Sequence, residues 1–386
     1  MSASVYSFEP GKEGDRMMMA GKKAWALTLV AATLAVLVAV GLAGCGNGNN
    51  GVTPGPTPAA GSEFVFVPDA VNNLLNVLVI GPDGSFNNGP VPVLATGSEP
   101  VWAAVAPNNQ FVYVTNFNSN SVSAFSLNTT SGAVAGIGGS PFPAGTAPGA
   151  VAVDPSGKFA YAANDGSNNV SGYSIGSGGA LAAVAGSPFP AGTTPQQGIA
   201  ATAGFVYVTN SGSSNISAYS LNSGTGALTP LSTSPFATGS APISLAMDPA
   251  GKFLFAANAN SNNVSAFTVN GDGSLSAASS SPFAAGNSPQ YLVTDRTGTH
   301  LYVVNVTDAT LDAYSIAGNG ALTPLATYFT GVNPEGVAVD AANKFVMVAN
   351  CNSGSLSVFG INGDGTLNSL GALSLGGCPQ AVATTH

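Results

Sequence analysis

The chain has 386 residues and a formal net charge of −9, and only 6% of its residues are Asp, Glu, Lys or Arg, against roughly a quarter in ordinary globular proteins. After residue 45 the sequence contains four cations, which are Lys158, Lys252, Arg296 and Lys344. Nucleic acids require clustered positive charge, so this composition excludes them as partners and argues against binding to anionic membrane surfaces.

An apolar segment near the start of the chain has the layout of an export signal. Lys22 and Lys23 precede an apolar run over residues 24–40, and Leu-Ala-Gly-Cys follows at 42–45. This pattern resembles a bacterial lipoprotein signal, in which the cysteine becomes the lipidated first residue. We predict that residues 1–45 are the signal segment and that Cys45 anchors the protein to a membrane. An uncleaved membrane-spanning helix is the alternative, since about 20 apolar residues span a bilayer.

Both alternatives export the rest of the chain and tether it on the periplasmic or cell-surface side. Gly46 after Cys45 gives no retention signal, which favours the outer membrane. Residues 46–62 are rich in Gly, Asn, Thr and Pro and cannot build a core, so they predict a flexible linker. Residues 63–386 remain as the folded domain.

A repeat runs through this domain. Seven short apolar strands each begin at a proline: Pro100, Pro148, Pro195, Pro242, Pro289, Pro334 and Pro379. Seven second strands end on Asp or Asn: Asp69, Asn116, Asn164, Asn210, Asn258, Asn305 and Asn350. Both series step by 45 to 48 residues, and a fixed period of this size indicates that each unit is one small sheet.

One period shows how the sheet is built. Residues 150–153, 159–164, 170–175 and 180–185 are short apolar runs separated by polar turns, which predict a four-stranded antiparallel meander. Seven such units predict an all-β, seven-bladed propeller. The first unit lacks an inner strand, and the proline strand at 379–383 has no unit of its own. We therefore predict that the C-terminal strand closes the ring by joining the N-terminal blade.

Two cysteines lie at the predicted seam. Cys351 follows the second strand of the last blade, and Cys378 precedes the closing strand. Because both positions lie on the same face of the ring, we predict a Cys351–Cys378 disulfide, which requires an oxidising compartment. Two free, buried thiols are the alternative.

Polar and aromatic side chains flank the prolines, where the inner strands begin. They are Glu99, Trp102, Gln196, Gln197, Gln290, Tyr291, Glu335 and Gln380. Acceptors, amides and aromatic rings around a concave mouth predict a site for a small polar ligand. Glu335, Gln380 and Glu99 come from three adjacent predicted blades. Solvated rim residues with no ligand are the alternative.

The repeat motifs are similar to those of a known family. Tyr-Val-Thr-Asn at 113–116 and 207–210 matches the YVTN motif of surface-protein propellers. The whole period resembles the seven-bladed lactonase family, which includes 6-phosphogluconolactonase, and the resemblance covers residues 63–386. It implies a lactone hydrolase with His, Arg and Glu at the channel mouth. The sequence departs from this pattern, because the domain has only His300, His386 and Arg296 of the first two types.

Two functions follow from these observations. The first is a tethered, monomeric binding or interaction module that recognises a small polar ligand or a protein, with no metal or cofactor. The second is a lactone hydrolase in which Glu335 or Glu99 activates water and Gln380 or Gln290 donates to the oxyanion.

Overall fold

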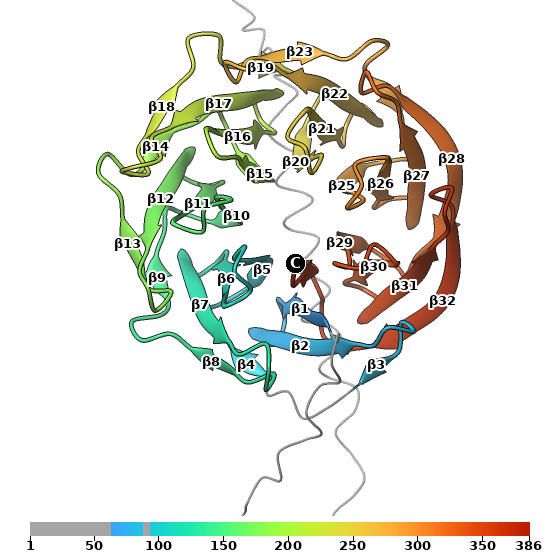
Figure 1. Cartoon of the computed structure of the whole chain (residues 1–386), viewed down its shortest axis with the longest axis horizontal. Coiled ribbons are helices and arrows are strands. Elements are labelled where there is room, and N and C mark those ends of the chain that lie inside the picture. Colours follow the sequence, from blue (N-terminus) through green and yellow to red (C-terminus); the bar gives the residue numbers. More distant parts are fainter. Residues whose placement is uncertain (1–62, 88–92) are drawn as a thin grey trace, which may run out of the picture. The chain divides into compact units, whose positions relative to one another are not determined.

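Seven antiparallel sheets surround a common centre in a computed structural model that describes residues 63–87 and 93–386 (Figure 1). The seven-bladed, all-β propeller predicted from the repeat is confirmed. The predicted signal segment, Cys45 and the predicted linker lie outside the described residues. Within the described ranges, no helix is long and apolar enough to cross a membrane.

Blades 2 to 5 share one plan. Blade 2 contains β5 (Pro100–Val105), β6 (Phe111–Asn116), β7 (Ser121–Leu127), β8 (Val134–Gly136) and β9 (Phe142–Pro143). Blade 3 contains β10 (Pro148–Val153), β11 (Phe159–Asn164), β12 (Asn169–Ile175), β13 (Leu181–Ala183) and β14 (Phe189–Pro190). Blade 4 contains β15 (Pro195–Ala201), β16 (Phe205–Asn210), β17 (Asn215–Leu221), β18 (Leu228–Pro230) and β19 (Phe236–Ala237). Blade 5 contains β20 (Pro242–Met247), β21 (Phe253–Asn258), β22 (Asn263–Val269), β23 (Leu275–Ala277) and β24 (Phe283–Ala284).

The other three blades differ at the outer rim or at the seam. Blade 6 contains β25 (Pro289–Thr294), β26 (His300–Asn305), β27 (Thr310–Ile316) and β28 (Leu322–Phe329). Blade 7 contains β29 (Pro334–Val339), β30 (Phe345–Asn350), β31 (Ser355–Ile361) and β32 (Leu367–Ser374). Blade 1 contains β1 (Glu63–Asp69), β2 (Leu74–Ile80), β3 (Phe86–Asn87), β4 (Leu94–Ala95) and β33 (Ala383–Thr384).

The outer strand of blades 2 to 5 is split, unlike the single fourth strand that the sequence predicts. In blade 3 the predicted strand 180–185 is only β13, and β14 pairs with the other end of β12. Pro188 lies between the two pieces, and proline has no N–H to donate to a ladder. In blades 6 and 7 the outer strand is continuous over eight residues, with one irregularity in its register.

The C-terminal end of the chain closes the ring, as predicted. β33 pairs with β1, and an isolated bridge joins Pro379 to Asp69. The paired segment lies farther along than the predicted 379–383. Between the two contacts, the Gln380 N–H donates to the Pro68 carbonyl at 3.0 Å, so the chain still follows β1.

The asparagine at the end of each second strand from blade 2 onward is fully buried, and its hydrogen bonds explain why it recurs. In blade 3, Asn164 Nδ2 donates to Asn169 Oδ1 at 2.8 Å and to Ser171 Oγ at 3.0 Å. Its Oδ1 accepts the Gly145 N–H at 3.1 Å. One side chain thus joins the second strand, the third strand and the loop entering the blade. A buried amide without such partners would be costly.

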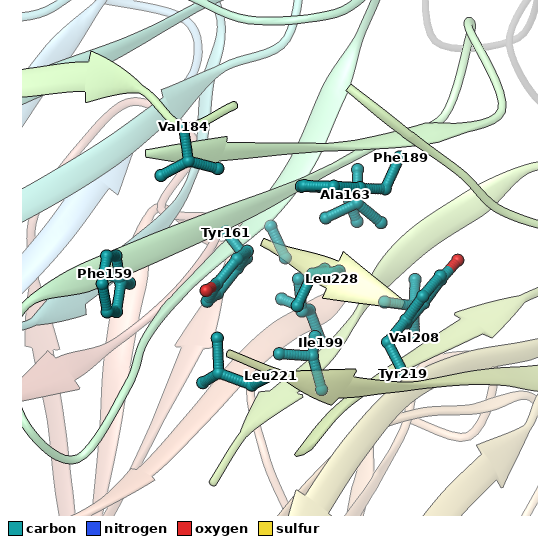
Figure 2. Packing of buried hydrophobic residues seen from close by; sticks show 13 residues of the cluster. Phe159, Tyr161, Ala163, Val184, Phe189, Ile199, Val208, Tyr219, Leu221 and Leu228 are labelled. Carbon is teal, nitrogen blue, oxygen red and sulfur yellow. The ribbon is translucent and has the colours of Figure 1, made fainter. Parts of the chain in front are cut away.

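The hydrophobic core lies between neighbouring blades. Figure 2 shows the cluster shared by blades 3 and 4, in which Phe159, Tyr161 and Ile199 are buried together. Tyr161 also donates its hydroxyl to the Gly226 carbonyl of the next blade at 2.8 Å. Gly226 has a φ of +75°, and a Cβ there would lie 2.3 Å from the Phe159 ring. Close packing of this kind fixes how each blade sits against the next.

Candidate functional site

Two positions at the start of each inner strand differ from blade to blade. The register is irregular just after the proline in blades 2 to 7, and such irregularities re-aim side chains. The residues two places after the seven prolines are Trp102, Ala150, Gln197, Ser244, Tyr291, Gly336 and Ala381. The residues one place after them are Val101, Gly149, Gln196, Ile243, Gln290, Glu335 and Gln380.

Trp102 occupies the middle of this arrangement. Its half-buried indole packs against the clusters of blades 2 and 3, blades 3 and 4, and blades 6 and 7. Blades 2 to 4 lie across the ring from blades 6 and 7 (Figure 1), so contacts with clusters on both sides place the indole near the ring centre. A partly exposed aromatic face of this kind is a platform on which a ligand ring can stack.

Tyr291, Gln197 and Glu335 come together beside this platform. The Tyr291 side chain is buried in the cluster that Trp102 contacts. Burial raises the pKa of Tyr291 well above its ordinary value, the charge of Glu335 raises it further, and a hydrogen bond from Gln197 opposes the shift. The phenol therefore keeps its proton. Glu335 is 4% exposed and accepts a hydrogen bond from Asn333.

The remaining predicted site residues make other contacts. Gln380 Nε2 lies 3.0 Å from Cys378 Sγ, and Gln290 Nε2 donates to Ser288 Oγ at 3.1 Å. Gln196 is half-buried at the start of β15. Glu99 accepts a hydrogen bond from Asn118.

The backbone position of Glu99 is structural. It has a φ of +56°, and the residues before the prolines of blades 3 to 7 share this conformation: Ala147, Thr194, Ala241, Ser288 and Asn333. Its N–H donates to Asn73 Oδ1 of the preceding blade at 2.8 Å. This position therefore forms the corner between two blades.

Ser244 is a candidate that the sequence reasoning missed. It lies two residues after the proline of blade 5, the position that Trp102, Gln197 and Tyr291 occupy in blades 2, 4 and 6. Its side chain is 1% exposed, and its hydroxyl has no hydrogen-bond partner among the described residues. Buried polar groups normally have partners. Aligning the seven repeats and reading the second position after each proline would have found it.

The seam is held by the disulfide between Cys351 and Cys378, with an S–S distance of 2.00 Å. Cys378 N–H also donates to Asp69 Oδ1 at 3.0 Å. Close to this point the strands touch, because a Cβ on Gly336 would lie 2.5 Å from the Ala381 Cα. Glu335 and Gln380 thus come from two inner strands in direct backbone contact.

An arginine, a histidine and a glutamate gather on the opposite face of the ring. Arg296 Nη2 donates to the Val339 carbonyl and to Thr384 Oγ1, both at 3.1 Å, and Nη1 lies 3.4 Å from His386 Nδ1. Glu63 accepts the Ala341 N–H at 2.8 Å. Arg296 therefore connects blade 6 to blade 7 and to the closing strand, and these hydrogen bonds help to hold the ring closed.

Burial and the neighbouring charges shift the ionisation of this group. Burial, reinforced by the nearby Asp340, raises the pKa of Glu63 to about 7 despite the opposing effect of the Ala341 N–H and the Arg296 charge. Burial lowers the pKa of His386. His300, the other histidine, lies 3.0 Å from Asp295, and its ring fills the space beside Gly365. Within residues 63–87 and 93–386, no three His, Cys, Asp or Glu side chains could together hold a metal ion.

The sequence matches a known protein family over most of its length. The family model described as "Lactonase, 7-bladed beta-propeller" matches residues 87–281 and 270–377. The chain belongs to this lactonase family. No curated protein matches it.

Solved structures of the same fold are similar to this lactonase-family chain. A protein from Bacteroides fragilis described as a putative 6-phosphogluconolactonase is 19% identical, with a TM-score of 0.72, and the match covers 86% of this chain and 100% of that one. The periplasmic gluconolactonase of Pseudomonas aeruginosa is 20% identical, with a TM-score of 0.71, covering 84% and 99%. At this identity the likeness establishes the fold.

Proposed function

We propose that this lactonase-family propeller binds an uncharged, polyhydroxylated ring of the sugar or aldonolactone type at the start of its inner strands. The observation that carries the proposal is the convergence of Tyr291, Gln197 and Glu335 beside the half-buried Trp102. A hydroxylated ring presents an apolar face to an indole and hydroxyl groups to amides and a carboxylate. The unpartnered hydroxyl of Ser244 adds one more polar group to this ring of positions.

The charge of this face favours a neutral ligand. All four cations of the described domain lie in the turns between first and second strands, on the opposite face. A phosphate or carboxylate group bound beside Tyr291 would meet the negative charge of Glu335. This argument separates the proposed ligand from phosphorylated lactones.

Hydrolysis of the bound lactone is the second candidate, and the family membership together with the buried carboxylate of Glu335 favours it. Glu335 would take a proton from water as the water oxygen bonds to the lactone carbonyl carbon. The protonated Tyr291 hydroxyl would donate to the resulting oxyanion. The ring C–O bond then breaks, and the leaving oxygen takes up a proton to give a hydroxy acid. Gln380 and Gln290 are replaced in the donor role by Tyr291, because their amides contact other groups.

Paired glutamate variants test both candidates. D-Glucono-1,5-lactone hydrolysis is followed by pH-stat with the purified full chain, Glu335→Gln, Tyr291→Phe and the matched control Glu99→Gln. Hydrolysis would be supported by turnover above the spontaneous rate, provided that Glu335→Gln abolishes this turnover and Glu99→Gln retains it. Binding alone would be supported if there is no turnover and the lactone raises the melting temperature of wild type but not that of Tyr291→Phe. The absence of both effects would reject the proposal.

We also propose that the propeller is exported and tethered through a lipid on Cys45. The support is the run of residues 24–45 and the need of the Cys351–Cys378 disulfide for an oxidising compartment. The lipid tether is tested by growing bacterial cells that express the chain in the presence of a palmitate analogue, which labels lipidated proteins. Label that Cys45→Ser removes is expected, whereas unlabelled wild-type protein in the soluble fraction would contradict the tether.

A further inference from the structure

A cavity of about 650 Å³ opens on the outer rim of blade 6, away from the ring centre. Residues of β27 and β28 form most of its wall, and Ala284 to Gly286, from the end of β24 of blade 5 onward, and Asp308 in the turn before β27 form the rest. We call this the blade 6 groove and describe it by four of its lining residues, Asp308, Asp312, Leu325 and Phe329. Its volume lies within the range of ligand sites in proteins, roughly 300–1,000 Å³.

The repeat is broken where this groove lies. The corresponding cavity on blade 4 is smaller, about 340 Å³, and it is lined by Ser213 and Ser217. Blades 2 to 5 and blade 7 have serine at both of these repeat positions: Ser119 and Ser123, Ser167 and Ser171, Ser213 and Ser217, Ser261 and Ser265, and Ser353 and Ser357. Blade 6 has Asp308 and Asp312 there. Blade 1 has Asn72 and Asn76 at these positions. Two negative charges therefore distinguish blade 6 from the other blades.

Asp312 is held in place inside the groove. Its side chain is 8% exposed and accepts hydrogen bonds from Thr327 Oγ1 at 2.7 Å and from the Gly286 N–H at 3.1 Å. The Tyr314 hydroxyl lies 3.4 Å from the same carboxylate. These neutral donors orient the carboxylate but do not neutralise its charge.

Asp308 lies at the open end of the groove. It accepts the Asn287 N–H at 2.7 Å and Asn287 Nδ2 at 2.9 Å. In the part of the chain that the structure describes, the one salt bridge is His300–Asp295. Neither groove aspartate has a cationic partner within that part, so a cation from outside would meet two oriented carboxylates.

Apolar side chains flank these carboxylates. Phe329 is 88% exposed and Leu325 is 36% exposed. Phe329 pairs with Thr310, and the residues at the same register in blades 2 to 5 are Pro143, Pro190, Ala237 and Ala284. A large, exposed aromatic ring thus replaces proline or alanine beside the acidic groups. The surface suits a ligand that combines a cation with an apolar group.

The edge of blade 6 is also open to strand addition. In blades 2 to 5 the outer strand consists of pieces of three and two residues, and short edges resist pairing. β28 has eight residues, and although Pro324 interrupts its start, the five residues after it, 325–329, form an uninterrupted edge. β32 of blade 7 is as long, but its groove positions are Ser353 and Ser357. Among blades 2 to 7, blade 6 alone combines a long edge with the two aspartates.

We propose that the blade 6 groove binds an extended, basic segment of a partner protein. The segment lies along the edge of β28, an arginine or lysine side chain reaches Asp308 and Asp312, and a neighbouring apolar side chain packs on Phe329 and Leu325. Main-chain hydrogen bonds supply affinity in strand addition, and alternate side chains supply specificity. The acidic charge selects a basic segment over a neutral one.

The test uses a fluorescein-labelled hexapeptide, Thr-Val-Arg-Val-Thr-Val, and the same peptide with glutamine in place of arginine. Fluorescence anisotropy measures their binding to the full chain, to the double variant Asp308→Ser with Asp312→Ser, and to Phe329→Ala. These variants restore residues that other blades carry, so they preserve the fold. Asp364→Ser, which removes an exposed carboxylate from a blade 7 hairpin, is the matched control for charge.

The arginine peptide is expected to bind at least about ten-fold more tightly than the glutamine peptide, as charge-assisted hydrogen bonds require. The double variant loses that difference, Phe329→Ala weakens both peptides, and Asp364→Ser changes neither. Equal affinity for the two peptides, or a double variant that binds like wild type, overturns the proposal. Arginine amide that competes as well as the peptide assigns the groove to a small cation instead. If sedimentation shows that wild type is a dimer and Phe329→Ala is a monomer, the groove binds a second copy of this chain instead.

Discussion

Removal of the Cys351–Cys378 disulfide tests how the ring is held closed. The bond joins residues 27 positions apart, and a loop of this length corresponds to about 3.5 kcal/mol of lost chain entropy in the unfolded state. For a domain of roughly 320 residues this amounts to a fall of about 5 °C in melting temperature. The Cys378 N–H bond to Asp69 and the pairing of β33 with β1 remain, so the variant still folds.

Differential scanning calorimetry compares wild type with the double variant Cys351→Ser, Cys378→Ser. Wild type measured with a reductant is the internal control, and it should melt at the temperature of the double variant. A change below about 1 °C, or a reductant that lowers the melting temperature of both proteins equally, would refute the reasoning that the disulfide restrains the seam.

Two further predictions concern packing and pH. Gly273→Ala forces a non-glycine residue into a φ of +82° and places a Cβ 2.3 Å from the Phe205 ring, so it should lower the free energy of unfolding by about 2 kcal/mol. Gly271→Ala in the same hairpin, where a Cβ meets nothing within 4 Å, should be nearly neutral in chemical denaturation, and equal effects would contradict the packing. Because folding raises the pKa of Glu63 from 4.5 to about 7, the folded state binds the extra proton between these values, and stability falls as pH rises through about 7. Between pH 5 and 8 the free energy of unfolding of wild type should fall by up to about 3 kcal/mol on account of Glu63, and Glu63→Gln should lack this fall. Parallel pH profiles of stability for wild type and Glu63→Gln would contradict the pKa shift.

The repeat made most of the fold predictable, because the prolines and asparagines occupy fixed places in every blade. Asn164 shows the reason, since its side chain joins three segments of one blade. The split outer strand was missed, because the interruption at Pro188 depends on pairing with the far end of β12. Local turn signals do not reveal such pairing.

The candidate site was predictable only as a set of positions. Trp102, Gln197 and Tyr291 were named because they follow the prolines, and the structure brings Tyr291 into contact with Gln197 and into the cluster that Trp102 contacts. The Glu99 side chain is oriented by a hydrogen bond with Asn118, and the Gln380 side chain by its contact with the disulfide. Both are tertiary contacts. The blade 6 groove likewise depends on packing between blades 5 and 6, although the serine-to-aspartate change was visible in the repeat.

The most direct test of the central claim is calorimetric titration with D-glucono-1,5-lactam, an uncharged analogue that resists hydrolysis. Binding to wild type and to Glu99→Gln with the same affinity, and a loss of about ten-fold or more in Tyr291→Phe and Glu335→Gln, is the predicted result. No heat of binding to wild type, or equal weakening by Glu99→Gln and Glu335→Gln, would contradict a ligand site at the ring centre.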